Sequence, residues 1–348
     1  MRTTQTAGAD LSARLNIIAS TALAIAATLS PALAAPCTNP DALGTSRTLV
    51  IDPSEHTRLG SMQYRKTLPL GPREVVLTFD DGPLPPYSSR VLDVLAAECT
   101  KATYFLVGSM AKAHPELVRR IAVEGHTIGT HSQNHPFTFH RMSQARAERE
   151  IDGGIASVSA ALHGLRPAPF FRIPGLLRAS SVEAYLASRG LMTWSADVPS
   201  DDWRRISDKE IVRRTLARLE AHNGGMVLLH DIRPATALAL PKLLRELKVR
   251  GFRIVHVVPA DGPVAKTATA PSQWAVRAAS RPSVKRAKRT RFAGRSVERL
   301  RSAGLRKTSR RHSIVGREAA RRRAARMAVM ENPGPVRGLF NFSRRIPE

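Results

Sequence analysis

The sequence predicts an α/β fold, an irregular or incompletely closed (β/α)7-8 barrel followed by a disordered or partly helical basic tail. Between residues 74 and 260, seven apolar runs of strand length alternate with amphipathic segments of helix length. Alternation of this kind is typical of parallel strands joined by helices. Seven strands are one fewer than a complete eight-stranded barrel needs. No glycine-rich phosphate loop follows the first run, which argues against a nucleotide-binding sheet.

The predicted elements follow one another in a regular order. The strand-length runs lie at 75–79, 102–107, 126–130, 168–172, 191–196, 225–230 and 252–258. The helix-length segments between them lie at 88–98, 110–125, 143–163, 180–190, 207–222 and 237–251. Ser143 stands at the expected N-cap of one helix, and Ser207 with Glu210 forms a capping-box pattern at the start of another.

The first 34 residues have the pattern of an export signal. Arg2 and Arg14 are the only basic residues before a stretch without charged residues at 15–34, which ends in small residues typical of a cleavage site. We therefore expect residues 1–34 to be a cleaved signal peptide and the protein to be periplasmic or extracellular. An uncleaved membrane anchor is the alternative, because the stretch is about long enough to span a bilayer.

Composition and charge divide the rest of the chain into three parts. Residues 35–73 are predicted to be an irregular lead-in, and residues 74–260 form the main domain. Residues 261–348 hold 23 of the 54 Lys and Arg residues but only 5 of the 28 Asp and Glu residues, so they carry most of the net charge of +26. This low-complexity tail is expected to bind an anionic envelope polymer or a membrane surface rather than nucleic acid, which an exported protein rarely meets. The alternative is a solvated tail without a partner.

The two cysteines, Cys37 and Cys99, would both lie in the exported part of the chain, where disulfides persist. We expect one bridge between them, which would tie the mature N-terminus to the first helix. Two unrelated buried thiols are the alternative.

Polar residues gather where the predicted strands end. The candidates are Asp80, Asp81, His131, His135, Arg172, Asp197, Asp201, Asp202, Trp203, His230 and Asp231. Because the C-terminal ends of parallel barrel strands meet on one face, these side chains are expected to converge in one active site.

Three of these residues have the chemistry of a metal site. His131 and His135 are four residues apart, so both imidazoles can face one point. Together with the Asp81 carboxylate they would make a three-ligand site with an open position, as in a catalytic zinc centre. Two solvated loop histidines are the alternative. The donor set suits zinc and also accepts cobalt, nickel or manganese.

Five ordered motifs resemble those of the polysaccharide deacetylases, which are carbohydrate esterase family 4 with the nodulation-protein-B homology domain. They are TFDDGP (78–83), HSQNH (131–135), FRIPG (171–175), DDW (201–203) and VLLH (227–230). The resemblance covers about residues 70 to 260, so it includes the main domain and excludes the basic tail.

The resemblance implies a role for each matching position near the metal. Asp80 would be the general base, and Asp81 would bind the metal with the two histidines. Arg172 would pair with Asp80 and orient it. The backbone N–H of Gly175 would stabilise the oxyanion. Leu176 stands where many members have an aromatic residue, so that part of the groove wall is expected to be lost.

The remaining positions concern the acid and the substrate. His230 would be the general acid, supported by Asp202, while Trp203 would line the groove and Leu228 would shape a pocket for the acetyl methyl group. The fourth motif is two residues longer than common versions. It is therefore open whether Asp202 or Asp197 supports His230.

The resemblance implies a metal-dependent hydrolase that removes acetyl groups from a polymer or oligomer of N-acetylglucosamine, such as a chitin oligosaccharide or peptidoglycan. It would cleave a linear amide C–N bond that is not a peptide bond. One alternative is another acetylated glycan or a small amide at the same site. A non-catalytic glycan-binding module is a second alternative. We expect a monomer, and the sequence does not choose the glycan.

Overall fold

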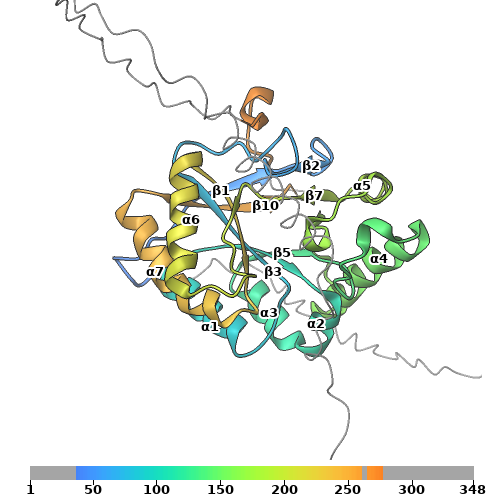
Figure 1. Ribbon diagram of the computed structural model, residues 1–348, viewed down its shortest axis with the longest axis horizontal. Coiled ribbons are helices and arrows are strands. Elements are labelled where there is room, and N and C mark those ends of the chain that lie inside the picture. Colours follow the sequence, from blue (N-terminus) through green and yellow to red (C-terminus); the bar gives the residue numbers. More distant parts are fainter. Residues whose placement is uncertain (1–36, 261–264, 277–348) are drawn as a thin grey trace, which may run out of the picture. The chain divides into compact units, whose positions relative to one another are not determined.

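A computed structural model describes residues 37–260 and 265–276 (Figure 1). The predicted signal peptide at 1–34 and most of the predicted tail at 261–348 lie outside the described residues. The strands are β1 (Thr45–Ile51), β2 (Arg58–Leu59), β3 (Glu74–Asp80), β4 (Thr103–Leu106), β5 (Thr127–Thr130), β6 (Phe170–Phe171), β7 (Met192–Trp194), β8 (Val198–Pro199), β9 (Gly224–His230) and β10 (Arg253–Pro259). The α-helices are α1 (Tyr87–Ala97), α2 (Gly108–Ala113), α3 (Pro115–Val123), α4 (Gln144–Ala161), α5 (Ser180–Ser188), α6 (Asp208–His222) and α7 (Pro234–Val249). Three short 3-10 helices are η1 (Phe139–Arg141), η2 (Pro174–Leu176) and η3 (Pro271–Trp274).

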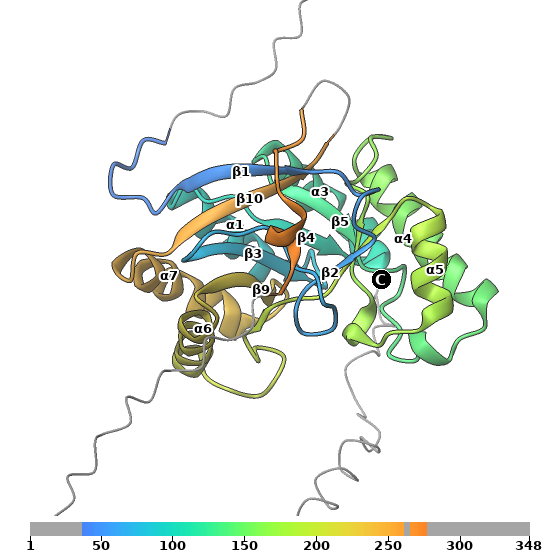
Figure 2. The ribbon, with the colours of Figure 1, turned by 90° about the horizontal axis from the view of Figure 1, so that it is seen from above.

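The strands form one parallel sheet in the order β1-β10-β3-β4-β5-β6-β7-β2, and β9 pairs with both β3 and β8. In Figure 1 the α-helices lie to the left of, below and to the right of the strands, while β1 and β2 lie toward the top. Figure 2 shows β1 along the upper edge, with α6 and α7 on the left and α4 and α5 on the right. Among the described strands, no ladder joins β8 to β7 or β2, so the sheet does not close. The prediction of an irregular, incompletely closed barrel is confirmed.

The alternation of side chains along β3 separates two parts of the core. Val75, Leu77 and Phe79 belong to the cluster that includes the apolar faces of the helices. Val76 belongs to a second cluster with Phe105, Trp194 and Met226, between the strands. Because successive side chains of a strand point to opposite faces, Asp80 lies on the same side as Val76. This alternation directs the last residue of β3 toward the barrel interior.

The lead-in at 35–73 is more regular than the sequence predicts. β1 pairs in parallel with β10, and β2 pairs with β7. Only Leu49 and Ile51 of β1 are fully buried, so the apolar alternation of TSRTLVI is weak. The prediction of an irregular segment is wrong for these two stretches, because their partner strands lie far away in the sequence.

The first described part of the predicted tail, residues 265–276, packs on the domain. Trp274 is 4% exposed and joins the same cluster as Leu68. Thr267 donates its N–H to Val50 O at 3.0 Å and accepts the Val50 N–H at 2.9 Å. The basic tail therefore does not begin at residue 261, because a buried tryptophan holds this stretch in place.

Several predicted helix boundaries differ in detail. The segment at 110–125 forms two helices, α2 and α3, because Pro115 has no N–H to continue the first one and instead begins the second. Ser143 is the N-cap of α4, but its side chain makes no capping hydrogen bond. Ser207 accepts the Glu210 N–H at 3.2 Å, whereas the Glu210 carboxylate pairs with arginines and leaves the capping box half complete.

Cys37 and Cys99 form a disulfide with their Cα atoms 5.7 Å apart. The bridge ties the chain before β1 to the residue that follows the C-terminal end of α1, as the sequence analysis expected. None of the described helices has the length and apolarity that crossing a membrane requires.

Candidate active site

The ends of four strands, β3, β9, β5 and β6, bring the site residues together. In the parallel ladder between β3 and β9, Asp80 is opposite His230. In the ladder between β5 and β6, Thr130 is opposite Phe171, so the residues that follow, His131 and Arg172, also leave the sheet side by side. The register of the sheet thus brings together residues that are up to 150 positions apart in the sequence.

Asp80 is held by a fully buried arginine. Its Oδ1 accepts a hydrogen bond from Arg172 Nη1 at 2.6 Å, and the arginine also donates to Ser195 O at 2.9 Å. The Arg172 guanidinium lies 4.2 Å from the centroid of the Phe105 ring. Burial raises the pKa of Asp80, while the charges of Arg172 and His230 oppose this, and the resulting pKa is about 6. Asp80 is therefore ionised at neutral pH and can accept a proton.

Asp81, His131 and His135 form the predicted three-ligand cluster, with one ligand atom of each within 4.8 Å of the others. Asp81 Oδ1 lies 3.5 Å from His131 Nε2 and 3.2 Å from His135 Nε2. Asp81 and His135 both have positive φ angles, 77° and 52°. Such backbone conformations are costly for residues other than glycine and gather at functional sites.

The donor set fits a divalent cation. Asp81 Oδ1 is buried and has no hydrogen-bond partner among the described residues, so this oxygen is available to a cation. His131 Nδ1 lies 2.6 Å from Arg172 O, which directs its proton to the carbonyl and leaves Nε2 free as a ligand. Burial and the neighbouring His135 hold the pKa of His131 well below its usual value, so the imidazole is neutral, as a metal ligand must be.

His230 is paired with Asp202. Asp202 Oδ1 lies 2.7 Å from His230 Nδ1, and Asp202 Oδ2 accepts the backbone N–H of His230 at 2.7 Å and the hydroxyl of Thr236 at 2.6 Å. Burial lowers the pKa of His230, but the charge and hydrogen bond of Asp202 and the charges of Asp81 and Asp80 outweigh it and raise the pKa to about 9. His230 is thus protonated at neutral pH, with Nε2 4.0 Å from Asp81 Oδ2.

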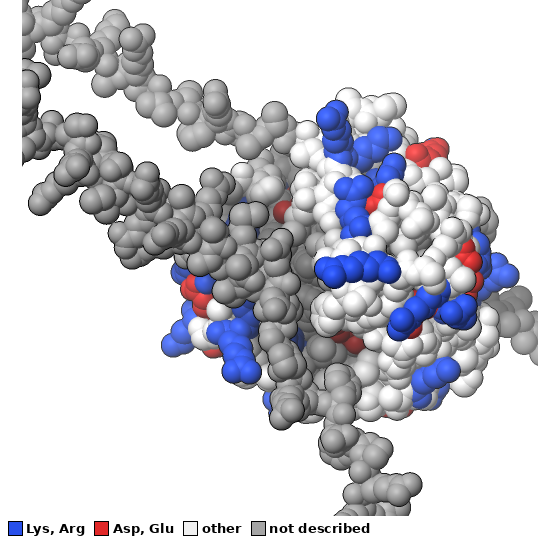
Figure 3. All heavy atoms as spheres, turned by 45° about the vertical axis from the view of Figure 1, so that its right-hand side comes forward, with Lys and Arg blue, Asp and Glu red and all other residues white. Residues whose placement is uncertain are grey.

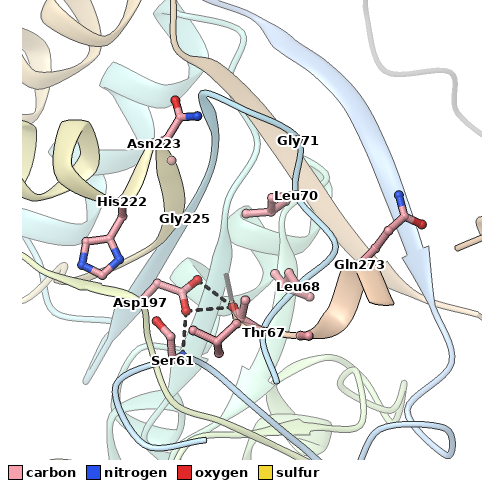
Figure 4. A pocket seen from close by; sticks show the side chains of 13 residues that line it. Ser61, Thr67, Leu68, Leu70, Gly71, Asp197, His222, Asn223, Gly225 and Gln273 are labelled. Atoms are coloured by element: carbon pink, nitrogen blue, oxygen red, sulfur yellow. Dashed lines mark hydrogen bonds between the residues drawn. The ribbon is translucent and has the colours of Figure 1, made fainter. Parts of the chain in front are cut away.

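Asp197, the other candidate support for His230, lies elsewhere. It accepts the Ser61 N–H at 2.7 Å and the Thr67 hydroxyl at 2.8 Å (Figure 4). It also accepts the Met226 N–H at 2.9 Å. It borders a cavity of about 90 Å³ beside Gly224 and Gly225, at the start of β9, whereas His230 ends that strand. The structure therefore assigns the contact with His230 to Asp202 and gives Asp197 a separate place in the barrel.

The predicted groove residues lie beside these groups. Trp203 is 39% exposed, and its ring is edge-on to His230 with the centroids 6.0 Å apart. Leu228 is buried two residues before His230 and points to the same face of β9. Gly175 lies in η2 with a φ of 59°, and its N–H has no hydrogen-bond partner among the described residues, so it is available as a donor.

One aromatic residue at the site, Phe137, was not predicted from the sequence. Phe137 is 70% exposed, and its ring meets the His135 ring edge-on at 4.9 Å. A Cβ atom at Gly175 would lie 3.5 Å from Phe137 Cδ1, so this phenylalanine stands beside η2. It supplies an aromatic surface where Leu176 had suggested that none remained. Phe137 follows the second motif by two residues, but its position beside Gly175 depends on the fold.

A buried carboxylate supports η2. Glu183 of α5 is 5% exposed and accepts hydrogen bonds from Arg178 Nε at 2.5 Å and from the Tyr64 hydroxyl at 2.8 Å. The neighbouring Gln63 donates to Leu176 O at 2.7 Å. The lead-in and α5 thus hold the turn that presents the Gly175 N–H, and nothing in the local sequence indicated this role.

Asp231 supports the loop after β3. It is fully buried, accepts a short hydrogen bond from Ser88, and lies so close to Gly82 that a Cβ atom there would collide with its carboxylate. Ser88 Oγ in turn accepts the Leu84 N–H at 2.7 Å. The sequence identified Asp231 only as a polar strand end, because its partners are more than 140 residues away.

A base carboxylate, an acidic histidine and a three-ligand cluster at the C-terminal ends of parallel strands define a hydrolase of the α/β barrel type. Residues 68–194 match the family described as polysaccharide deacetylase. The chain is 32% identical over 219 residues to a chitooligosaccharide deacetylase of Sinorhizobium fredii, a match that covers 58% of this chain and 98% of that protein. It is 33% identical over 195 residues to a peptidoglycan-N-acetylglucosamine deacetylase of Bacillus cereus, covering 55% of this chain and 89% of that protein.

The fold has a similar relative among solved structures. A peptidoglycan deacetylase of Bdellovibrio bacteriovorus superimposes with a TM-score of 0.57 and 31% identity, over 65% of this chain and 62% of that one. The chain belongs to the polysaccharide deacetylase family and is a hydrolase.

Proposed function

We propose that this protein hydrolyses the N-acetyl group of N-acetylglucosamine residues in a glycan, with a divalent cation held by Asp81, His131 and His135. The observation that carries the proposal is the pairing of Asp80 with His230 across β3 and β9, next to that cluster. An ionised carboxylate and a protonated imidazole then lie on neighbouring strands at one reacting centre. The substrates in the names of the relatives, chitooligosaccharide and peptidoglycan N-acetylglucosamine, support this substrate class.

A cation bound there would lower the pKa of a coordinated water and polarise the amide carbonyl. Asp80 accepts the proton of the attacking water, and Arg172 fixes the carboxylate for that transfer. The Gly175 N–H donates to the oxyanion, and one such donor is typically worth ~3 kcal/mol of transition-state stabilisation. His230 gives its Nε2 proton to the leaving amine, which otherwise departs poorly. The products are acetate and a glucosamine residue.

Trp203 and Phe137 support a glycan as the substrate, because sugar rings bind to exposed aromatic faces through their C–H groups. One ring lies beside His230 and the other beside His135, so each offers an aromatic surface next to a residue of the proposed reacting centre. Leu228 adds an apolar surface for the acetyl methyl group on the same face of β9 as His230.

The test is acetate release from N-acetylglucosamine oligomers and from peptidoglycan, before and after a chelator, and after return of zinc, cobalt, nickel or manganese. We expect release that the chelator abolishes and zinc restores. Acetate release from acetyl-xylan and from a small acetamide tests the alternative amide or ester activities. Glycan binding without metal-dependent release from any substrate would favour a non-catalytic binding module and refute the proposal.

We also propose that the protein is exported and acts as a monomer in the periplasm or outside the cell, with its basic tail on an anionic envelope polymer or membrane surface. The disulfide between Cys37 and Cys99 supports an oxidising compartment. Fractionation of cells that express the chain with and without residues 277–348 tests the tail, since this truncation keeps the packed Trp274. Unchanged envelope association after truncation would refute the role of the tail.

A further inference from the structure

Two arginines lie against Trp203 at the edge of the active site. The Cζ atom of Arg204 is 5.9 Å from the centroid of the Trp203 ring. Arg233 donates a short hydrogen bond from Nη2 to the Trp203 carbonyl oxygen. Arg233 follows His230 by three residues, and its backbone N–H donates to His230 O at 3.3 Å. Both guanidinium groups are thus positioned by the aromatic residue that stands edge-on to the proposed general acid.

The nearest acidic residue does not neutralise these arginines. Asp201 Oδ2 accepts from Arg214 at 2.8 Å and from Arg218 at 2.7 Å, so two other arginines already use this carboxylate. Arg204 Nε is 3.8 Å from Asp201 Oδ1, and the side chain is 60% exposed. In the part of the chain that the structure describes, no carboxylate lies within 4.0 Å of Arg233.

The deeper carboxylates do not cancel this charge either. Asp80 is paired with Arg172 at 2.6 Å and Asp202 with His230 at 2.7 Å, and Asp81 belongs to the proposed cation site, so each has its own cation. Lys and Arg side chains are also more prominent than Asp and Glu on the face drawn in Figure 3. The positive charge of Arg204 and Arg233 beside Trp203 is therefore available to an anionic ligand.

We propose that Arg204 and Arg233 form a carboxylate subsite beside Trp203, so that the preferred substrate is an acidic N-acetylated glycan rather than a neutral oligomer of N-acetylglucosamine. This inference rests on the proposed function of the same site. A guanidinium has five N–H donors in a planar fork, and one bond to the Trp203 carbonyl leaves most of the Arg233 donors free. Arginine forks match carboxylates with two parallel hydrogen bonds, which adds geometric selectivity.

Two kinds of acidic glycan share this chemistry. The carboxylate can be the free lactyl group of N-acetylmuramic acid without an attached peptide, in a strand that alternates with N-acetylglucosamine, or the uronic acid of an alternating N-acetylglucosamine–glucuronic acid strand. In both, the acidic sugar is next to the residue that would be deacetylated. The test therefore includes both strands and the carboxyl-reduced form of each, which has the same size without the charge.

The experiment measures kcat/KM for acetate release by the full chain with these four saccharides and with a neutral N-acetylglucosamine oligomer. The variants are Arg204→Gln, Arg233→Gln, their combination and Arg204→Glu. Arg245→Gln is the matched control, because Arg245 is an exposed residue of α7 without a carboxylate partner among the described residues, ~18 Å along the helix from Arg233.

We expect the wild type to prefer at least one acidic strand over its reduced form. The double variant should lower that preference by about three- to tenfold, since each exposed ion pair contributes modestly. Arg204→Glu should lower it further, high salt should weaken it, and Arg245→Gln should leave it unchanged. The acidic glycan whose preference over its reduced form falls in these variants carries the carboxylate that the subsite binds. An unchanged preference in the double variant, or equal losses for acidic and reduced strands, would overturn the subsite.

A binding experiment with the Asp80→Asn variant separates this inference from the proposed function. Tryptophan fluorescence measures the binding of the same saccharides. Asp80→Asn removes the proposed base and leaves both arginines in place. If the wild type releases no acetate but Asp80→Asn binds acidic strands in an arginine-dependent way, the proposed function fails and the subsite stands. Equal binding of acidic and reduced strands refutes the subsite whatever the activity.

Discussion

Replacing Asp202 with asparagine removes the charge that keeps His230 protonated and changes the shape of the site very little. The two carboxylate oxygens accept three hydrogen bonds, from His230 Nδ1, from the His230 backbone N–H and from Thr236. An asparagine has one oxygen for these donors. If that oxygen keeps the backbone N–H and the hydroxyl, the amide NH2 group faces Nδ1 and opposes the imidazolium form.

The size of the effect follows from the pKa of His230. Burial lowers this pKa, and the charge and hydrogen bond of Asp202, helped by Asp81 and Asp80, raise it to about 9. Without the Asp202 charge we expect the pKa to fall to its ordinary value of 6.5 or below. At pH 8 the protonated fraction would then drop by about thirtyfold, and lost orientation adds to this, because general acids contribute roughly 10²- to 10⁴-fold. We expect kcat at pH 8 to fall by about 10²- to 10³-fold.

The assay is the pH dependence of kcat for acetate release. Activity should rise as Asp80 loses its proton near pH 6 and fall as His230 loses its proton near pH 9. In Asp202→Asn the alkaline limb should move to lower pH, while the acidic limb should move much less, because Arg172 still opposes the effect of burial on the pKa of Asp80. Asp197→Asn is the control, because Asp197 contacts Ser61, Thr67 and Met226 and not His230. An alkaline limb that stays in place in Asp202→Asn, or that moves in Asp197→Asn, would refute the reasoning.

Three further predictions concern the cation, η2 and the N-terminus. Asp81→Asn should lower the bound metal measured by elemental analysis, whereas Asp80→Asn should keep the metal and lose activity; the reverse pattern would contradict the assignment. Glu183→Gln should lower the free energy of unfolding by ~1–3 kcal/mol, because it weakens a buried acceptor of several hydrogen bonds; unchanged denaturant midpoints would exclude this. Replacing both Cys37 and Cys99 with serine should cost about 4 kcal/mol of unfolding free energy, since the bridge closes a loop of 62 residues. A loss below ~1 kcal/mol would show that the bridge constrains the unfolded chain very little.

The sequence predicted the parts of this protein that local pattern encodes. The alternation of strand-length and helix-length segments predicted the barrel. The positions of Asp80 and His230 at strand ends predicted that they meet, because parallel strands place such residues on one face. What it could not predict depends on contacts between distant segments. Phe137 reaches Gly175 through the path of a loop, and Glu183 meets Tyr64 across more than 100 residues.

The choice between Asp197 and Asp202 shows the same limit. Both are acidic residues after one strand, and motif length alone left the choice open. β8, a two-residue strand that the sequence did not predict, pairs with β9 and separates the two carboxylates. Asp197 precedes β8 and meets the start of β9, while Asp202 follows β8 and meets the end of β9. A short strand with no apolar periodicity of its own thus determines which aspartate supports the histidine.

The pairing of β1 with β10 has a consequence for how the domain reaches its native state. The two strands match residue for residue from Thr48↔His256 to Ile51↔Pro259, so the first of the described strands completes its ladder only with the last of them. Contacts this distant in sequence raise the contact order and slow folding, because a long loop must close before they form. During synthesis, β1 therefore remains without its partner until about residue 260 is available, and the domain cannot be completed piece by piece from its N-terminus.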